Sequence, residues 1–426
     1  MMRMRRIILV VLLSACLGVV AWAATTDYIP VAALRHTAEY RLIQWGNALW
    51  GDPLAEHYPP GALSGLVRTA AGQPVGGATV LVASPVGDTF VTKSGATGHY
   101  RLPNLPPGIY RPVAAHRGYT DAVYRAPLRL NTVLVRPGRE TTDANLTMLT
   151  QNLAVPAFDA VEVEPAEEAT HREGDELYQA RRQAYRLLHG ETVVGEGYVY
   201  EPTVGEGPWP TLLLILPGPV LAWEVVPVPL AAQGFVVIAV YPARKMDIAG
   251  EVDSMRAALV ALRAGQLSAH ADATRIGVLG GSFTSLHVYN LLQREDGIGA
   301  ALVLGGVADG FRIRRQFEDR TLIPAHGFDK VLIGLGLPNR APQLYFRYSV
   351  RYHLEGLPPL CLIHGTADSF VPHSQSELLA GELAARGRPY ELHLVPGLAH
   401  YFTGEETSLL LRITMDFFEQ YLGGLG

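Results

Sequence analysis

The C-terminal half of the chain contains a candidate nucleophile, a candidate acid and a candidate base. Each of these three residues follows an apolar, strand-like run. Ser282 follows "RIGVLGG", Asp368 follows "PLCLIHGTA" and His400 follows "YELHLVPGLA". A serine hydroxyl attacks a carbonyl when a base takes its proton, an imidazole can be that base at neutral pH, and a carboxylate holds the imidazole's tautomer. This order of types predicts catalysis by Ser282, with His400 as base and Asp368 as orienting acid.

Each of these residues also has an ordinary structural explanation. Ser282 can cap the helix that follows it, Asp368 can cap the helix through "SQSELLAGEL", and His400 can be a loop histidine. Three independent structural roles would not place each residue directly after its own strand. The joint pattern therefore favours a catalytic triad.

The elements that must position these residues alternate between strands and helices from about residue 179 to residue 426. After an expected hairpin, "AYRLLHGETVVGEGYVYEP", short apolar runs such as "TLLLILPG", "FVVIAVYP" and "AALVLGG" end in turn residues. Helical stretches such as "EVDSMRAALVALRAG" lie between them. This alternation predicts an α/β fold, a doubly wound and mostly parallel sheet with its site at the C-terminal strand ends.

Residues 180–426 resemble α/β-hydrolases of the prolyl oligopeptidase or dienelactone hydrolase type. The matching segments are "AAQGFVVIAVYPAR", "DATRIGVLGGSFTS", "RYHLEGLPPLCLIHGTADSFVPHSQSELLAGEL" and "YELHLVPGLAHYF". The resemblance implies the same three roles for Ser282, Asp368 and His400. Asp309 is a less favoured alternative acid, and His364 and His373 are expected to be supporting or surface residues.

The chain departs from this family pattern at two positions. Thr284 stands where a glycine is usual, which costs about 1 kcal/mol of crowding. Pro219, in "LPGPVLAW", stands where relatives carry an oxyanion donor, and proline has no N–H. We expect the oxyanion donors to be the N–H groups of Phe283 and Val220, with Leu221 or a side chain as the alternatives for the second donor. Losing one such donor costs about 10²–10³ in rate.

An insertion at about 309–357 leaves one strand and returns before the next, which predicts a lid over Ser282. Phe311 and Phe317, with Trp223 from the 217–223 loop, are the candidate substrate-binding residues. The alternative is that the aromatic side chains attach the insertion to the sheet. The arginines of "FRIRRQFEDR" are expected on a solvated face rather than against an anionic substrate.

The part before this domain has a different pattern. Residues 61–150 alternate short β-rich runs with turn residues, which predicts a β-sandwich. The segments "GLVRTAAGQPVGGATVLV" and "TGHYRLPNLPPGIYRPVAAHRGY" resemble the carboxypeptidase regulatory-like domain, an immunoglobulin- or transthyretin-like module. The resemblance implies a structural or accessory role. Residues 151–178 are acidic and lack a periodic pattern, so they are expected to form a solvated linker.

The first 60 residues predict a targeting segment and a helix. "MMRMRR" precedes an uncharged apolar stretch over residues 7–24. This stretch fits a cleaved signal peptide with "AWA" at the cleavage site, a lipidated Cys16 after "LSA", or a retained membrane anchor. All three place the protein outside the cytoplasmic membrane, secreted or membrane-anchored. Residues 25–60 connect it to the sandwich, with a helix over 28–50 whose apolar stripe packs on the next domain or lies at a membrane surface.

Composition excludes several classes of protein. The net charge of −5 and the absence of a basic patch argue against a nucleic-acid partner. With two cysteines and no metal-ligand spacing, the sequence predicts no disulfide framework, no metal and no cofactor. It does not specify an oligomeric state.

Together these patterns predict an extracytoplasmic serine hydrolase that acts on a small-molecule ester through an acyl-enzyme. The first alternative is a serine peptidase of the prolyl oligopeptidase type, although the chain lacks that family's substrate-filtering β-propeller. The second is a surface binding protein with a hydrolase-like domain that has lost turnover, which the "LPGP" segment favours.

Overall fold

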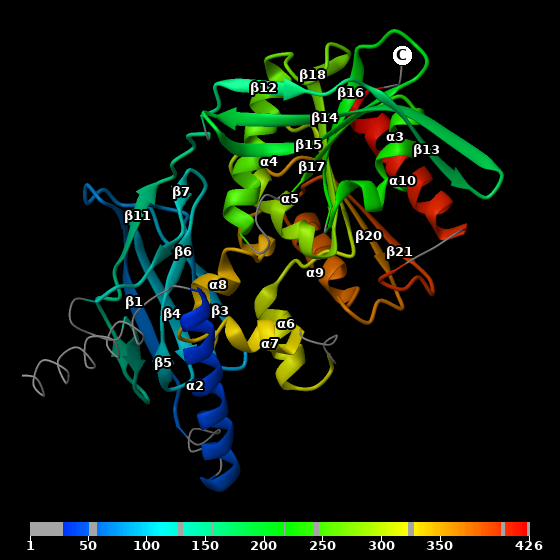
Figure 1. Cartoon of the computed structure of the whole chain (residues 1–426). Helices are drawn as coiled ribbons and strands as arrows, with labels where there is room; N and C mark the ends of the chain where they lie inside the picture. The colour runs from blue at the N-terminus through cyan, green and yellow to red at the C-terminus, as the bar shows by residue number, and fades with distance from the viewer. Residues whose placement is uncertain are drawn as a thin grey trace, which may run out of the picture. The chain divides into compact units, whose positions relative to one another are not determined.

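The computed structural model describes residues 29–50, 58–126, 131–155, 157–216, 218–241, 247–322, 328–401 and 405–423. The chain forms two compact units (Figure 1). The sandwich unit comprises Met1–Thr150 and Phe311–Arg347, and the sheet unit comprises Gln151–Gly310 and Tyr348–Gly426. The expected triad residues all belong to the sheet unit.

The sheet unit is built on a ten-stranded mixed sheet. Its parallel part has the order β17-β16-β18-β19-β20-β21. The strands are β16 (Trp209–Ile215), β17 (Val236–Tyr241), β18 (Ala271–Gly281), β19 (Ala300–Leu304), β20 (Leu360–Gly365) and β21 (Tyr390–Val395). These are the apolar runs of the sequence, and the predicted α/β fold is confirmed.

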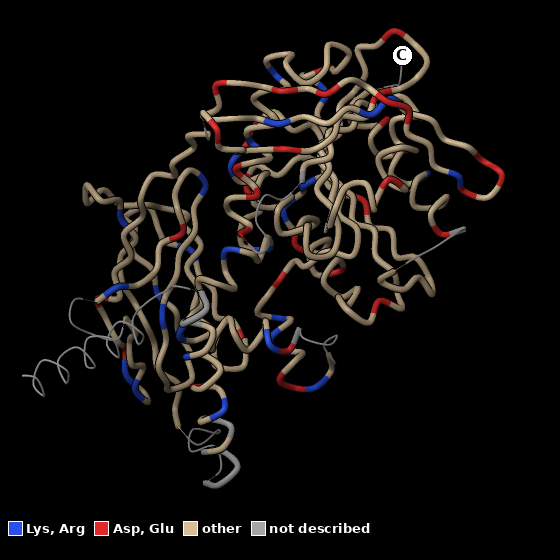
Figure 2. Tube along the Cα trace, viewed as in Figure 1, with Lys and Arg blue, Asp and Glu red and all other residues tan. Residues whose placement is uncertain are grey.

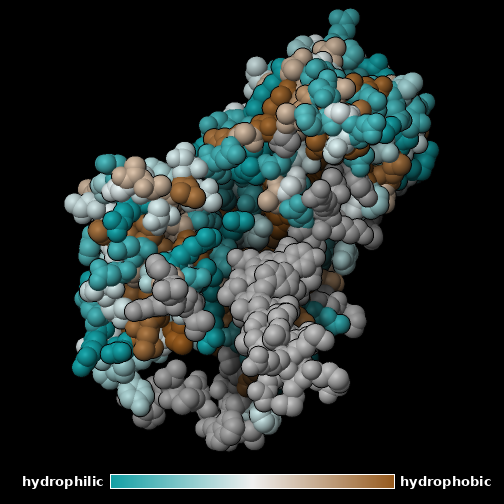
Figure 3. All heavy atoms as spheres, turned by 60° about the vertical axis from the view of Figure 1, so that its left-hand side comes forward, coloured by the Kyte–Doolittle hydropathy of each residue, from teal (hydrophilic) through white to brown (hydrophobic). Residues whose placement is uncertain are grey.

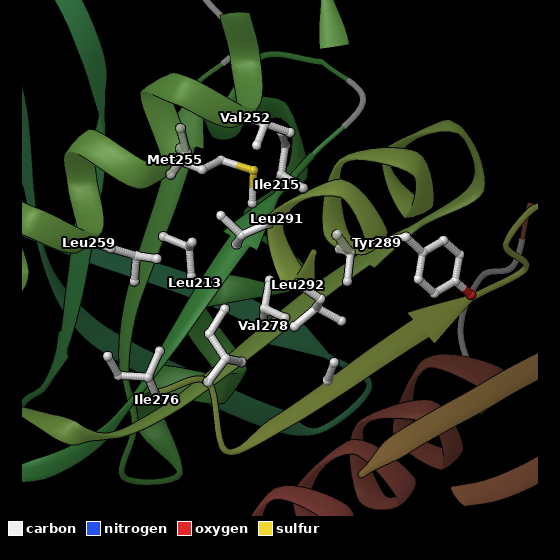
Figure 4. Close-up of a cluster of buried hydrophobic side chains, with 14 of the residues drawn as sticks. Leu213, Ile215, Val252, Met255, Leu259, Ile276, Val278, Tyr289, Leu291 and Leu292 are labelled. Atoms are coloured by element: carbon white, nitrogen blue, oxygen red, sulfur yellow. The ribbon is translucent and has the colours of Figure 1, made fainter. Parts of the chain in front are cut away.

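Helices cover both faces of this sheet. On one face lie α4 (Ile248–Arg263), α5 (Ser285–Leu292) and α9 (Ser374–Ala384), and on the other lie α3 (Pro227–Ala232) and α10 (Glu405–Leu422). Figure 4 shows side chains of α4, such as Met255, meeting Leu213 of β16 and Leu291 of α5 in one core cluster. Burial on both faces explains why the parallel strands are continuous apolar runs.

The acidic segment that the sequence predicts as a linker forms strands instead. β12 (Ala160–Val163) and β13 (Glu167–Glu173) pair with β14 (Glu176–His189), which forms the expected hairpin with β15 (Thr192–Pro202). Its glutamates lie opposite arginines of β14: the cross-strand partners are Glu162 and Arg186, Glu167 and Arg182, and Glu168 and Arg181. Figure 2 shows both acidic (red) and basic (blue) positions on these strands. Opposite charges on facing strands stabilise a sheet, so the acidic composition reflects strand pairing.

The sandwich unit contains the expected β-sandwich. One sheet is formed by β1 (Gly61–Thr69), β4 (His99–Leu105), β7 (Tyr119–Thr120), β10 (Glu140–Thr141) and β11 (Leu146–Thr150). The other is formed by β2 (Thr79–Ala83), β3 (Thr89–Lys93), β6 (Val113–Ala115) and β8 (Ala122–Val123), and β5 (Gly108–Tyr110) pairs separately with β9 (Val133–Val135). Leu63, Val80, Tyr100 and Leu146 contribute to one buried core between them. On the face seen in Figure 3, apolar residues form patches separated by polar ones.

The insertion predicted as a lid contains α6 (Gly310–Glu318), α7 (Phe328–Gly334), α8 (Pro342–Phe346) and η3 (Val350–Tyr352), and residues 311–347 belong to the sandwich unit. Its centre is Arg314, whose side chain is fully buried. The guanidinium donates to the Leu332 carbonyl at 3.0 Å and the Tyr345 hydroxyl at 3.3 Å, pairs with Glu318, and lies 4.9 Å from the Tyr40 ring of α2 (Ile29–Trp50). The predicted solvated position is therefore wrong for Arg314. Its charge is paired and hydrogen-bonded, which makes burial of a guanidinium acceptable.

Helix α2 is present where the sequence predicts it, but its apolar stripe is not its packed side. Tyr40 and His36 are buried, whereas Leu34 is 72% exposed, Leu42 66% and Trp45 62%. His36 hydrogen-bonds to the Gly334 carbonyl of α7 at 3.0 Å. No helix in the described part of the chain is both long and apolar enough to span a membrane. The predicted targeting segment, residues 1–24, lies outside the described residues.

Candidate active site

The nucleophile candidate stands at a sharp turn between strand and helix. Ser282 follows the last residue of β18 and begins the 3₁₀ turn η2 (Ser282–Thr284), which leads into α5. Its φ is +51°, in the left-handed region that costs a non-glycine residue about 1–3 kcal/mol. The turn needs the glycines before it, because a Cβ on Gly280 would lie 2.8 Å from Val288 and one on Gly281 would lie 2.7 Å from the Leu304 carbonyl oxygen. The central strand thus holds the hydroxyl at the sheet's C-terminal edge.

The three residues that the sequence predicts as a triad come together in one hydrogen-bonded chain. The Ser282 Oγ lies 2.8 Å from the His400 Nε2, and the His400 Nδ1 lies 2.7 Å from the Asp368 Oδ2. The Asp368 side chain is 2% exposed and that of His400 is 8% exposed. With Nδ1–H donated to the carboxylate, Nε2 is left free to accept the serine proton.

Several donors hold the Asp368 carboxylate. Its Oδ1 accepts hydrogen bonds from the N–H groups of Phe370 at 2.8 Å and Val371 at 2.9 Å. The buried His364 places its Nε2 3.4 Å from Oδ2. Burial raises the pKa of Asp368, but the hydrogen bonds from His364, His400 and the Val371 amide outweigh burial and hold that pKa well below its usual range. The group is therefore a carboxylate at neutral pH.

Thr284, which replaces the usual glycine, contributes hydrogen bonds at the turn. Its side chain is buried, and its Oγ1 accepts from the Gly281 N–H and donates to the Gly281 carbonyl, each at 2.9 Å. The sequence predicts only crowding here. The hydroxyl instead pairs both backbone groups of the residue that precedes the nucleophile.

We expect Thr284→Val to lower the free energy of unfolding by about 1–3 kcal/mol, because it leaves a buried N–H without a partner. Thr284→Ser keeps the hydroxyl and is expected to lose less than half as much. Urea unfolding monitored by fluorescence measures both. Equal losses for valine and serine would show that the methyl group, and not the hydroxyl, matters.

The residues predicted as oxyanion donors lie in two turns of the sheet unit. Phe283 immediately follows Ser282 in η2, where the first N–H groups of a helical turn have no partner inside it. Val220 begins η1 (Val220–Trp223), and the first N–H used within that turn is Ala222's, donated to the Pro219 carbonyl at 3.0 Å. The N–H groups of Val220 and Leu221 come earlier in the chain than the Ala222 N–H. The hydrogen bond to the Pro219 carbonyl therefore does not involve them. Their role stays a prediction.

The three predicted substrate-binding residues lie in different units and differ in burial. Trp223 is half-buried and packs in the sheet unit. Phe311 does not line a substrate pocket as the sequence predicts. It belongs to the sandwich unit, is fully buried and stacks on Tyr345 with ring centroids 5.3 Å apart. Phe317 belongs to the same unit, with its ring 5.8 Å from the Arg314 guanidinium. The aromatic pattern of this insertion therefore indicates packing around Arg314.

The alternative acid, Asp309, is committed to another partner. Its Oδ2 accepts from Arg351 Nη1 at 2.8 Å, and the carboxylate is 2% exposed. Among the described residues, one group offers metal-ligand atoms within 4.8 Å of one another, namely Cys361, Glu391 and His393. Burial and the neighbouring Glu391 raise the pKa of the Cys361 thiol, which disfavours the thiolate that a metal needs.

Two features near the triad were missed by the sequence analysis. Phe370 and Tyr401 contact the His400 ring. The available signal was their position, two residues after the acid in "DSF" and one residue after the base in "HYF". Glu251 of α4 and His287 of α5 form a buried pair below the nucleophile turn. Periodicity alone assigns both to apolar helix faces, so no signal distinguished them.

Two known protein families match parts of this chain. Residues 251–425 match the prolyl oligopeptidase family, and residues 62–149 match the carboxypeptidase regulatory-like domain. The chain is a serine hydrolase. The matched family segment of this hydrolase includes Ser282, Asp368 and His400, and the match over 62–149 confirms the resemblance stated for the β-sandwich.

Solved structures similar to this hydrolase include both esterases and peptidases. An esterase from Thermogutta terrifontis with bound propionate shares 19% identity over 61% of this chain and 94% of its own, with a TM-score of 0.42. An acylaminoacyl peptidase in complex with Z-Gly-Gly-Phe-chloromethyl ketone shares 16% identity over 81% of this chain and 62% of its own, with a TM-score of 0.47. A puromycin-hydrolyzing peptidase from Mycobacterium tuberculosis shares 18% identity over 87% and 70%, with a TM-score of 0.46.

Proposed function

We propose that this hydrolase cleaves carboxylic esters through an acyl-enzyme on Ser282. The single observation that carries the proposal is the hydrogen-bonded chain from the Ser282 Oγ through His400 to Asp368. The positive φ of Ser282 adds to it, since backbone strain of this kind is kept at functional sites.

The reaction follows from the geometry. The Ser282 Oγ attacks the ester carbonyl carbon while the His400 Nε2 takes its proton, and Asp368 stabilises the resulting imidazolium. The carbonyl oxygen becomes an oxyanion that the N–H groups of Phe283 and Val220 stabilise. His400 then gives the proton to the leaving alkoxide, and the alcohol departs from the acyl-enzyme. A water molecule, deprotonated by His400, releases the carboxylic acid and restores Ser282.

A fluorophosphonate probe tests the nucleophile directly. We expect the wild-type protein to be labelled at one serine and the folded Ser282→Ala variant not to be labelled, because the probe reacts only with an activated hydroxyl. Intact-mass measurement gives the stoichiometry. A folded wild-type protein that takes up no label would support the alternative of a hydrolase-like binding protein without turnover.

Peptide hydrolysis is the second candidate, and the match of residues 251–425 to the prolyl oligopeptidase family favours it. Ester hydrolysis is preferred because the described residues before the sheet unit form a helix and a β-sandwich rather than a propeller that admits only peptides. Rates on p-nitrophenyl acetate and on aminoacyl p-nitroanilides distinguish the two. Faster turnover of the anilides would reverse the preference.

We also propose that the protein acts outside the cytoplasmic membrane. The arginine-rich start and the apolar stretch over residues 7–24 support a signal peptide or an anchor. The exposed Leu34, Leu42 and Trp45 of α2 suit a helix close to a lipid surface. The mass of the mature N-terminus, measured on protein from separated membrane and soluble fractions, distinguishes cleavage, lipidation at Cys16 and retention.

A further inference from the structure

Two aromatic rings contact the imidazole of the proposed base. The Phe370 ring stacks on His400 with centroids 5.0 Å apart and planes 21° apart. The Tyr401 ring meets His400 edge-on at 5.2 Å and meets Phe370 edge-on at 5.3 Å. Phe370 follows the acid in the loop after β20, and Tyr401 follows the base in the loop after β21. The two catalytic loops thus each contribute one ring to a single cluster.

The exposure of this cluster is uneven. The His400 side chain is 8% exposed, whereas Tyr401 is 68% exposed. An aromatic side chain that only supports the histidine loop gains most when its ring is covered. Tyr401 instead presents most of its surface to solvent while its ring meets the His400 imidazole edge-on. That combination is typical of a ring that packs against a ligand.

The chemistry identifies which part of the ligand lies here. The Asp368 carboxylate occupies Nδ1 of His400, so only Nε2 can return the proton to the leaving oxygen. That oxygen must approach Nε2 to a hydrogen-bond distance of about 2.6–3.2 Å. A substituent one or two bonds beyond it then lies within contact distance of rings whose centroids are 5.0 Å and 5.2 Å from the imidazole.

We propose that Phe370 and Tyr401 form an aromatic subsite for the leaving group, so that the enzyme prefers esters of arylmethyl alcohols such as benzyl alcohol. This inference rests on the proposed esterase function and deepens it by naming the leaving-group class. Edge-to-face and offset contacts between aromatic rings stabilise a complex beyond the effect of the buried area. This additional stabilisation raises an equilibrium or rate constant by about threefold to tenfold. The subsite is therefore expected to favour a benzyl over a saturated ring of similar size by that factor.

Benzyl acetate and cyclohexylmethyl acetate provide a matched pair of substrates, because both release acetate and a primary alcohol and differ only in the aromaticity of the ring. We expect the kcat/KM ratio of benzyl to cyclohexylmethyl ester to be about 3–10 in the wild-type enzyme. Tyr401→Leu is expected to bring the ratio close to 1, and Tyr401→Phe, which keeps the ring, is expected to retain it. Tyr390→Leu is the matched control, since Tyr390 begins β21 at the end opposite His400.

The outcomes separate this proposal from simpler ones. If Tyr401→Leu slows both esters equally and leaves the ratio unchanged, the ring only positions His400 and the subsite is excluded. A wild-type ratio near 1 also overturns the subsite, provided that fluorophosphonate labels Ser282. A wild-type protein that is neither labelled nor active contradicts the proposed function instead. Should Tyr401→Leu fail to fold, the wild-type ratio and inhibition by benzyl alcohol against cyclohexylmethanol still decide the question, and equal inhibition would overturn the subsite.

Discussion

Asp368→Asn is expected to lower the kcat for ester hydrolysis by about 10⁴, the loss seen for the same change in a trypsin-type triad. The backbone amides of Phe370 and Val371 already donate to Oδ1. An asparagine would keep its carbonyl oxygen there and turn its NH₂ group toward His400. The imidazole must then accept at Nδ1 and carry its proton on Nε2, where it can no longer take the serine proton. Steady-state kinetics on p-nitrophenyl acetate, scaled to folded protein, measures the loss.

Asp309→Asn is the matched control, since Asp309 is also a buried aspartate after a strand of the same sheet and was the alternative acid. Because its carboxylate pairs with Arg351, its loss is expected to reduce stability while changing kcat by less than tenfold. A larger loss of kcat in Asp309→Asn than in Asp368→Asn would show that Asp309, and not Asp368, is the orienting acid. The Asp368 pKa is held below its usual range, so its charge persists throughout the pH range of such assays.

The triad could be predicted from the sequence because its information is local. Each proposed catalytic residue lies within a few residues of the end of an apolar run, and parallel strands bring their carboxyl ends to one edge of a sheet. Chain order and strand ends were therefore enough to bring together Ser282, Asp368 and His400. The distances between the three side chains depend on tertiary packing, and so do the groups that hold Asp368, such as the buried His364. The periodic pattern of the sequence does not predict either of them.

Two of the errors share one physical cause. Composition predicts solvation when the partners of charged residues are far away in the sequence. The glutamates of β12 and β13 looked like a linker because the arginines that pair with them lie on β14. Arg314 looked solvated because its partners, Leu332, Tyr345 and Tyr40, come from three other helices or turns. In both cases long-range pairing, which single-sequence patterns do not contain, decided the structure.

The stripe on α2 shows the opposite error. Leu34, Leu42 and Trp45 have helical spacing, and spacing of this kind predicts the buried face of a helix. The helix instead buries His36 and Tyr40, whose polar atoms find partners in Gly334 and Glu318. Periodicity thus predicted the helix correctly and its packed side incorrectly. The apolar side chains of Leu34, Leu42 and Trp45 are therefore exposed on α2.

The buried pair below the nucleophile turn should dominate the local stability of the sheet unit. His287 Nε2 contacts the Glu251 carboxylate, and the two side chains are 2% and 3% exposed. The pair joins α4 to α5, and the His287 ring also meets the Phe283 ring edge-on at 5.3 Å. Removing His287 strands the Glu251 carboxylate in the interior, which costs about 3–5 kcal/mol. Removing Glu251 leaves a neutral imidazole without its hydrogen-bond partner, which costs about 1–3 kcal/mol.

We therefore expect His287→Leu to lower the free energy of unfolding by about 3–5 kcal/mol and Glu251→Leu to lower it by about 1–3 kcal/mol, and the double variant to lose much less than the sum. Two apolar side chains of similar volume leave no buried polar group without a partner. Urea unfolding of the full chain, followed by fluorescence and circular dichroism, gives the coupling energy. The exposed pair of Glu377 on α9 and His373 just before that helix, 3.8 Å apart, is the matched control, with an expected coupling below about 1 kcal/mol.

The pair also predicts a dependence of stability on pH. Burial lowers the pKa of His287 and outweighs the opposing effect of the Glu251 carboxylate. The unfolded chain, where a histidine has a pKa of about 6.5, then binds the proton more tightly than the native state. The contribution of His287 to stability is fully present above that pH and is lost as the pH falls toward the lowered native pKa.

The double leucine variant is expected to show a flatter stability profile between about pH 7 and 5. An unchanged slope in that variant would assign the pH dependence to other groups and show that His287 does not titrate as a buried neutral base.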